Sequence, residues 1–316
     1  MDNHDSGTFV VVLLSPFHFH LILHPVIHLW SPLAADNTLP MKKINYCILI
    51  LLLHCITPLI AQEGKPNRLE NKKGTFYFYY GYNRAIYSKT NLHFSGPNYD
   101  FTLYDLKGSD RPSKFNATYI NPTTFSVPQY NYRLGYFFTK NFALSAGIDH
   151  MKYVMNKNQP SVISGVITNE ASPTYAGTYL NHPIIVKEDL LTFEHTNGFN
   201  FVTLELEYIP KVASVCKGKI AMLWNTGIGG VWVVTKTDVR VMNDGLDNRF
   251  HLSGYALALK TGPRIEYNHR FFLAGEAKGG YATLPDVLIK NSSPERADHN
   301  LGFLEYYVVG GINFRL

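Results

Sequence analysis

The sequence predicts an all-β fold: a closed, antiparallel, up-and-down transmembrane β-barrel of eight strands, preceded by an N-terminal signal peptide. Three observations predict it. Several segments alternate strictly between apolar and polar residues, short turns alternate with long links, and no long apolar run follows residue 61. A period of two is typical of a strand with two different faces, and strands can cross a bilayer only in a closed sheet.

The clearest alternation covers residues 252–284, where two strands are joined by a short turn at 268–270. One phase is apolar, with Leu257 and Leu259, and the other includes Lys260 and Arg264. One face therefore suits hydrocarbon and the other suits ions. Pro263 lacks a backbone donor, so we expect it at a β-bulge.

The same pattern predicts the remaining strands, at 75–87, 130–138, 142–154, 200–209, 219–234 and 301–316. Short links lie near residues 139, 213 and 269, and long links cover 88–128, 155–198, 235–251 and 284–300. Outer-membrane barrels have short periplasmic turns and long extracellular loops. An even number of strands then places both ends of the barrel in the periplasm.

The N-terminal part divides into three segments. Residues 41–61 contain a Lys pair, a short apolar stretch and a final Ala61, which predicts a secretory signal peptide cleaved after Ala61. Residues 1–40 are interpreted as an upstream extension without a structural role, 62–73 as a periplasmic spacer and 74–316 as the barrel. A lipoprotein alternative would use Cys55, but Leu53 and His54 make a poor processing site.

Composition argues against several classes of partner. The net charge is +5, yet no run of Lys or Arg exceeds two residues, so we expect no nucleic-acid partner. Cys216 is the one cysteine after the signal peptide, which predicts no intrachain disulfide. His18, His20, His24 and His28 do not have metal-ligand spacing. We expect neither a metal nor another cofactor.

The polar phase is expected to face the barrel interior. It gathers charges of both signs into a lumen network of Arg133, Asp149, Glu205, Glu207, Lys260, Arg264, Glu276, Lys278 and Glu305. In an eight-stranded barrel such side chains fill the lumen, which disfavours a diffusion pore. The opposite orientation would cost about 2–4 kcal/mol for each Lys or Arg facing lipid. A soluble secreted barrel of lipocalin type is the alternative architecture.

The chain resembles the small outer-membrane β-barrel proteins of Gram-negative bacteria, the OmpA-like eight-stranded group. The resemblance covers about residues 74–316 and rests on 132–138 (YRLGYFF), 141–147 (NFALSAG), 261–267 (TGPRIEY) and the alternation of Val308, Gly310, Ile312 and Phe314. It implies an integral outer-membrane location, contact with outer-membrane lipid and lipopolysaccharide, and insertion by the barrel-assembly machinery. It also implies a structural or surface-binding role, with an extracellular ligand that the sequence does not identify.

An enzymatic function is the alternative to this role. Outer-membrane lipid A deacylases and phospholipases resemble one another in a His-x-Ser pair, and this chain has His251 and Ser253 at the start of a strand. Residues i and i+2 share a face, so the imidazole is a candidate base for the hydroxyl. The flanking asparagine motif of those enzymes is absent. The segment 194–198 also contains an acid, a histidine and a hydroxyl, and we interpret its Asn-Gly pair as a turn. We expect a non-enzymatic role.

Overall fold

The computed structural model describes residues 71–114, 116–119, 121, 127–291 and 293–316. The proposed extension and signal peptide, and most of the spacer, lie outside these residues. Within them the chain forms antiparallel β-structure with one 3₁₀ turn, η2 (Ala117–Tyr119). The prediction of an all-β antiparallel fold is confirmed. No helix in the described residues has the length and apolarity needed to cross a membrane.

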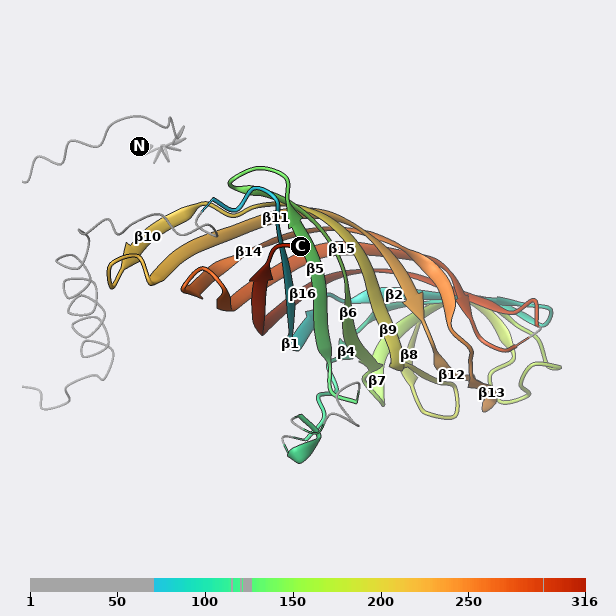
Figure 1. The fold of residues 1–316 in the computed structure, drawn as a ribbon. Coiled ribbons are helices and arrows are strands. Elements are labelled where there is room, and N and C mark those ends of the chain that lie inside the picture. The colour runs from blue at the N-terminus through green and yellow to red at the C-terminus, as the bar shows by residue number, and fades with distance from the viewer. Residues whose placement is uncertain (1–70, 115, 120, 122–126, 292) are drawn as a thin grey trace, which may run out of the picture. The chain divides into compact units, whose positions relative to one another are not determined.

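Eight long strands pair in a ring. They are β1 (Thr75–Tyr87), β5 (Tyr130–Phe137), β6 (Phe142–Met155), β9 (Leu191–Tyr208), β11 (Ile220–Thr235), β14 (His251–Tyr267), β15 (Phe271–Leu288) and β16 (Arg296–Phe314). Neighbours in this list are hydrogen-bonded, and β1 also pairs with β16 from Phe76 opposite Phe314 to Tyr87 opposite Phe303. This last pairing closes the sheet on itself, so the eight strands have no free edge along the paired stretch (Figure 1).

Short turns gather at one end of the ring, which we call the turn end. Asn268 and His269 both have positive φ, 50° and 57°, as the two central residues of a type I′ turn require, and the amide of Arg270 donates to Tyr267 O. The amide of Asn268 donates to Lys219 O of the neighbouring turn, and the amide of Ile209 donates to Asn141 O. The hairpin of β9 and β11 continues past Pro210 as β10 (Lys211–Val215), which pairs with β11. The start of β1 and the end of β16 lie at this same end.

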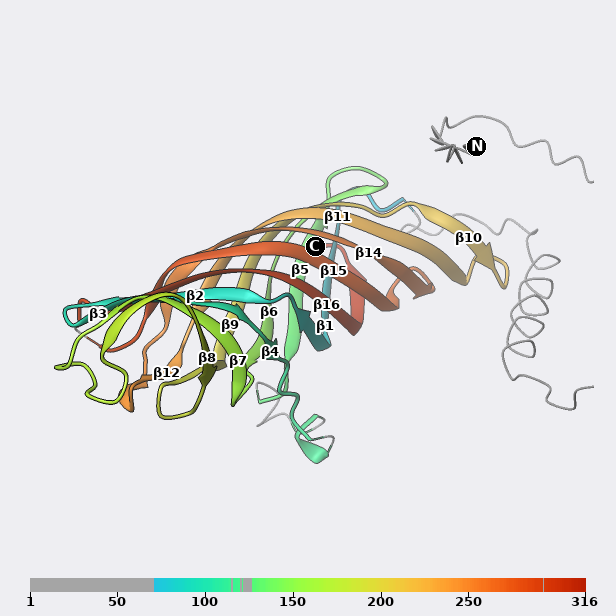
Figure 2. The ribbon, with the colours of Figure 1, turned by 180° about the vertical axis from the view of Figure 1, so that it is seen from behind.

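The four long links lie at the opposite end, the link end. The sequence predicted long loops there, whereas much of their described length is paired β-structure. The sheet continues from β16 through β2 (Thr90–Gly96), β3 (Tyr99–Leu106), β7 (Gln159–Ile167) and β8 (Gly177–Val186) (Figure 2). β12 (Asp238–Val241) pairs with β9 and with β13 (Asp244–Asp247), and β4 (Gly108–Ser109) pairs with β6. The described strands therefore number sixteen in one sheet, twice the eight that the sequence predicted, and eight of them make the ring.

Hydrophobic side chains form two buried clusters. The larger one contains residues of β2, β3, β7, β8 and β12 as well as ring strands, including Phe94, Phe101, Phe193 and Phe199. It explains why β2, β3 and β7 form, since each of these strands buries one face in this cluster. The smaller cluster includes Tyr77, Tyr79 and Phe272.

Two local predictions were wrong. Asn197 and Gly198 do not turn the chain; they lie inside β9, near a register shift between β6 and β9. Pro263 does not lie at a bulge, because the register of β14 runs unbroken on both sides, opposite Trp224 on β11 and between the Thr261–Ala277 and Arg264–Ala274 pairs with β15. In both places pairing with the neighbouring strands decides the backbone conformation, and it outweighs the local preference for a turn or a bulge.

Candidate functional site

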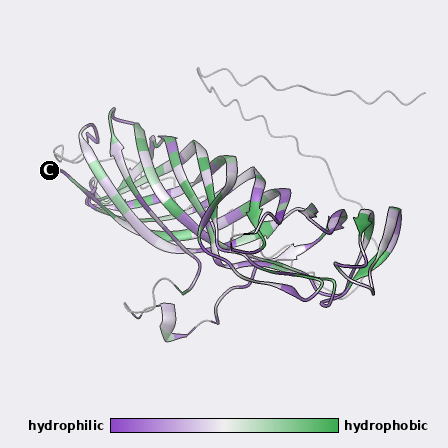
Figure 3. Cartoon of the chain, turned by 90° about the vertical axis from the view of Figure 1, so that its right-hand side faces the viewer, coloured by the Kyte–Doolittle hydropathy of each residue, from purple (hydrophilic) through white to green (hydrophobic). Residues whose placement is uncertain are grey.

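The two faces of the ring differ sharply in polarity. Leu257 and Leu259 of β14 are 61% and 62% exposed, whereas Lys260, the next residue of the same strand, is 3% exposed. The same alternation runs along the neighbouring strands (Figure 3). All nine charged residues predicted to line the lumen are buried inside the ring. Apolar groups thus face outward, and ions face inward.

Glu205 is the centre of the charged interior. Its carboxylate lies 2.5 Å from Arg133 Nη1, 2.9 Å from Lys260 Nζ and 2.8 Å from Lys278 Nζ. These cations come from β5, β14 and β15, so one side chain of β9 links strands on three sides of the interior. Asp149 of β6 also pairs with Arg133, at 3.4 Å, and with Lys278.

Further carboxylates surround Lys260. Glu207 and Glu276 lie 3.1 and 3.4 Å from its Nζ, and Asn225 donates to both of these carboxylates at 2.7 Å. Tyr77 and Ser145 donate to Glu207, and Tyr307 donates to Glu276 at 2.7 Å. Sequence reasoning missed these neutral partners, although the inward phase of each strand contains them.

Glu305 accepts a hydrogen bond from Asn131 at 2.6 Å, and its second oxygen is buried without a hydrogen-bond partner in the described residues. This network, which we call the Glu205 network, brings together eight of the nine predicted residues. Such pairing holds the strands in register and fills the interior with side chains.

Arg264, the ninth residue, belongs to a separate cluster at the turn end. It donates to Glu266 at 2.9 Å and to Asn313 at 2.6 Å, and its guanidinium lies 3.5 Å from the Phe272 ring centre. Lys72 Nζ reaches Glu266 at 2.6 Å from the segment before β1. Glu266 shares the inward phase of Arg264 and was detectable from the sequence; no sequence pattern points to Lys72.

Outward side chains form an apolar band around the turn-end part of the ring. On β9 and β16 the outward residues Leu204, Leu206, Leu304 and Val308 are all exposed. Farther towards the link end the same outward phase becomes polar, with Glu194 and Thr196 on β9 and with Asp298 and Asn300 on β16. The change marks the outer limit of the apolar band, and the strand ends beyond it project past the band.

The two residues of the candidate catalytic pair, His251 and Ser253, each contact another residue and not one another. Ser253 is buried and lies 2.6 Å from the Thr235 hydroxyl, while His251 Nε2 pairs with Asp286 on β15 at 2.8 Å. The register of β11 and β14 shifts next to these residues, between Val233 and Val234. The geometry therefore does not supply a hydrogen bond from Ser253 to His251, and the hydrolase alternative stays a prediction.

Ser253 instead begins a buried chain of polar groups beyond the apolar band. Thr235 contacts Thr237 at 3.2 Å, and the Thr237 hydroxyl lies 3.0 Å from His195 Nδ1. His195 Nε2 faces His299 Nε2 at 3.5 Å. Burial lowers the pKa of His299 to about 3, and burial together with His299 lowers the pKa of His195 well below its usual value. Both rings are therefore neutral at physiological pH.

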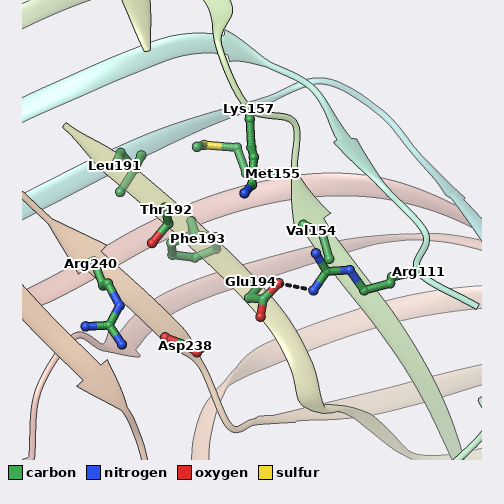
Figure 4. Close-up of a pocket in the computed structure, with 10 residues that line it drawn as sticks. All are labelled: Arg111, Val154, Met155, Lys157, Leu191, Thr192, Phe193, Glu194, Asp238 and Arg240. Carbon is green, nitrogen blue, oxygen red and sulfur yellow. Dashed lines mark hydrogen bonds and ion pairs between the residues drawn. The ribbon is translucent and has the colours of Figure 1, made fainter. Parts of the chain in front are cut away.

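A polar pocket of about 190 Å³ opens on the outer side of β6, β9 and β12 (Figure 4). Arg111 bonds Glu194 at 2.7 Å there, and Asp238, Arg240 and Lys157 also line the pocket. The lining contains both charge signs, so the pocket offers contacts to a polar solute without selecting one charge.

The described residues include no group of three or more His, Cys, Asp or Glu side chains that would hold a metal ion. Cys216 is exposed in the turn between β10 and β11. Neither observation points to a cofactor.

No family model matches the sequence, and no curated protein is similar to it. Among solved structures, the chain is similar to the outer membrane protein OprG from Pseudomonas aeruginosa, at 11% identity and a TM-score of 0.38, over 79% of this chain and 100% of that one. The outer membrane protein AlkL in lipid bilayers gives 9% identity, a TM-score of 0.38 and coverages of 81% and 98%. The attachment invasion locus protein Ail of Yersinia pestis is 9% identical, with a TM-score of 0.29, over 77% of this chain and 99% of that one. The resemblance to small outer-membrane β-barrels is thus found again among solved structures.

Proposed function

We propose that this protein is an integral outer-membrane β-barrel with a structural or surface-binding role. The observation that carries the proposal is the orientation of the two faces: Leu257 and Leu259 point outward, and Lys260 and Lys278 are buried inside. A closed ring satisfies its backbone hydrogen bonds internally, as a lipid environment requires.

The soluble alternative fits this geometry poorly. Soluble proteins rarely expose a continuous apolar surface of more than a few hundred Å². Here exposed large apolar side chains occur on every ring strand, for example Leu134, Leu144, Trp232 and Tyr281. Such a surface is suited to acyl chains.

A surface-binding role is favoured over a diffusion pore. The Glu205 network occupies the ring interior, and the larger hydrophobic cluster is built at the link end. The link strands β2, β3, β7 and β8 form an ordered sheet rather than loops, and β8 exposes Leu180 at its edge. Single-channel conductance in a planar bilayer would contradict the filled lumen.

The turn end, with both ends of the barrel, faces the periplasm, and the link end faces outward. Residues 41–61 direct secretion, the assembly machinery inserts the barrel, and outer-membrane lipid and lipopolysaccharide surround it.

Surface proteolysis of cells that produce the full chain tests insertion and orientation together. Lys187 lies exposed in a link and Lys217 lies exposed in a turn. We expect trypsin to cut beside Lys187 in intact cells and beside Lys217 only after lysis. The folded protein should also migrate differently on gels before and after heating. Cleavage at Lys217 in intact cells, or a protein that stays soluble without detergent, would refute the proposal.

A further inference from the structure

A groove crosses the outward face of the ring and has a volume of about 750 Å³. Small residues form its floor, among them Thr261, Pro263, Gly275 and Ala277. Larger side chains form its walls, including Trp224, Tyr306 and Val308, which are all exposed. The lining is almost entirely apolar except at one end, where Arg84 and Tyr119 stand.

The groove has a defined direction and length. Trp224 lies opposite Pro263, Thr261 lies opposite Ala277, and Tyr306 lies between Ala277 and Arg84. The groove thus crosses β11, β14, β15, β16 and β1 in succession. Four strand spacings of about 4.8 Å give it a length of roughly 19 Å. One leaflet of a bilayer is roughly 15 Å of hydrocarbon, so the groove accommodates most of one acyl chain.

Arg84 supplies a cation at the link-end side of the groove. It lies on the outward phase of β1, where a charge facing lipid is unfavourable unless an anion or water compensates it. Its Nη1 donates to Asn83 O at 2.7 Å and its Nη2 to the Tyr119 hydroxyl at 3.1 Å. Both acceptors are neutral, and a guanidinium has five N–H donors, so donors remain for an anion.

The charge around Arg84 is complementary to a phosphate. Lys152 and Arg111 lie near enough to interact electrostatically with each other, and Lys152 also with Arg84. The carboxylates close to this group are Asp110 and Glu194, the latter paired with Arg111. Three cations therefore face two anions around Arg84, at the link-end side of the groove.

We propose that this groove binds one phosphorylated membrane lipid, with an acyl chain along the floor from Tyr306 to Trp224 and the phosphate on Arg84. The inference rests on the proposed membrane location and adds a specific lipid site to it. Arg forms bidentate, charge-assisted hydrogen bonds with phosphate, which would hold the headgroup while the groove holds the chain.

Two tryptophans provide an internal reporter. Trp224 lines the groove and Trp232, also outward on β11, is not among its lining residues. Two variants of the full chain keep one reporter each: Trp30→Phe with Trp232→Phe, and Trp30→Phe with Trp224→Phe. The probe is phosphatidylglycerol with a brominated acyl chain, present as a small fraction of a phosphatidylcholine bilayer. We expect stronger fluorescence quenching of Trp224 than of Trp232.

Matched substitutions separate the site from general lipid contact. With Arg84→Gln, about tenfold more brominated phosphatidylglycerol should be needed for the same preferential quenching of Trp224, since the substitution removes a charged hydrogen bond. Ala277→Leu should abolish the preference by filling the floor. Arg249→Gln, at another exposed arginine of the link end, and Ala146→Leu, at an exposed alanine on β6, should leave it unchanged.

The outcomes distinguish the site from the membrane location itself. If a bilayer made wholly of brominated phosphatidylcholine quenches neither tryptophan, the outward face does not meet lipid and the proposed function fails. If that bilayer quenches both tryptophans, yet sparse brominated phosphatidylglycerol quenches them equally, the membrane location stands and the lipid site is refuted. In the variant that keeps only Trp224, equal quenching with and without Arg84→Gln would refute the role of Arg84.

Discussion

Lys260 and Lys278 stand directly opposite each other on β14 and β15, with both ammonium groups inside the ring. Opposed like charges destabilise a strand pair. Here the Glu205 carboxylate forms ion pairs with both, through Oε2 with Lys260 Nζ at 2.9 Å and through Oε1 with Lys278 Nζ at 2.8 Å. A side chain of β9, from across the interior, therefore makes this pairing of β14 and β15 tolerable.

Glu205→Gln should destabilise the fold strongly, because it leaves Arg133, Lys260 and Lys278 with less compensating charge in a buried site. Breaking a buried ion pair typically costs about 3–5 kcal/mol. Urea unfolding of the refolded protein in detergent measures the loss. Glu188→Gln is the control, since Glu188 and Lys157 form an exposed pair at 2.7 Å, and an exposed pair contributes less than about 1 kcal/mol. Equal effects of the two substitutions would show that the Glu205 network does not hold the ring together.

The buried histidines predict a loss of stability in mild acid. An unfolded histidine protonates near pH 6.5, whereas the pKa of His299 is about 3 in the fold. Above about pH 6.5 the histidines are neutral in both states and the fold keeps its full stability. As the pH falls from there towards the folded pKa, only the unfolded state binds the proton, so the free energy of unfolding falls by up to about 1.4 kcal/mol per pH unit for each histidine.

Urea midpoints at about pH 7.5 and about pH 5 test this, since the carboxylates with ordinary pKa values stay ionised in that interval. His299→Asn should flatten the dependence, and His182→Gln, at an exposed position on β8, should not. A pH dependence that is unchanged in His299→Asn and in a His195→Asn companion would contradict the assignment.

His93 should make the fold more stable in mild acid, the opposite of the effect of His195 and His299. Burial lowers its pKa, but hydrogen bonds to Asp298 at 2.6 Å and Asp100 at 3.1 Å outweigh burial and raise it overall. The pair that joins β2 to β16 is therefore complete below about pH 6.5 and weakens as the pH rises through the raised pKa. Amide exchange in β2, corrected for its intrinsic pH dependence, should show greater protection in the acidic range. His93→Gln should remove that difference; if the difference persists, another group causes it.

Ser253 should be dispensable for any lipid chemistry. Its hydroxyl bonds Thr235 and is buried, while His251 pairs with Asp286. We expect purified wild type and Ser253→Ala to release no fatty acid from phospholipid or lipopolysaccharide. Release by wild type that Ser253→Ala abolishes would establish the hydrolase alternative, and it would imply that the strand ends rearrange to bring His251 to Ser253.

The ring strands were predictable because one physical rule covers each of them. Every ring strand separates a lipid-suited face from an ionic one, so a period of two identifies both the strand and its inward phase. The predicted 75–87 coincides with β1, and the turn at 268–270 joins β14 to β15. The link strands follow another rule. β8 is exposed on both faces for most of its length, so it lacks the alternation, and its pairing with β7 is a tertiary effect.

The interior was predictable as a set of residues but not as a set of contacts. The inward phase identifies Glu205 and Lys278 separately. Their strands, β9 and β15, are not neighbours in the ring, so their contact depends on how the closed ring folds across its interior. Lys72 illustrates the same limit, because it precedes β1 whereas its partner Glu266 lies on β14, which is not a neighbour of β1 in the ring.

Site-directed spin labelling in lipid vesicles tests the central claim, that the apolar face meets acyl chains, most directly. In a background with Cys47, Cys55 and Cys216 replaced by serine, labels are placed at Leu257 and Leu259, and at Asp298 beyond the apolar band. We predict that Leu257 and Leu259 are accessible to oxygen and shielded from a water-soluble nickel chelate, and that Asp298 shows the reverse. Ready access of the nickel chelate to Leu257 and Leu259 would contradict a transmembrane ring.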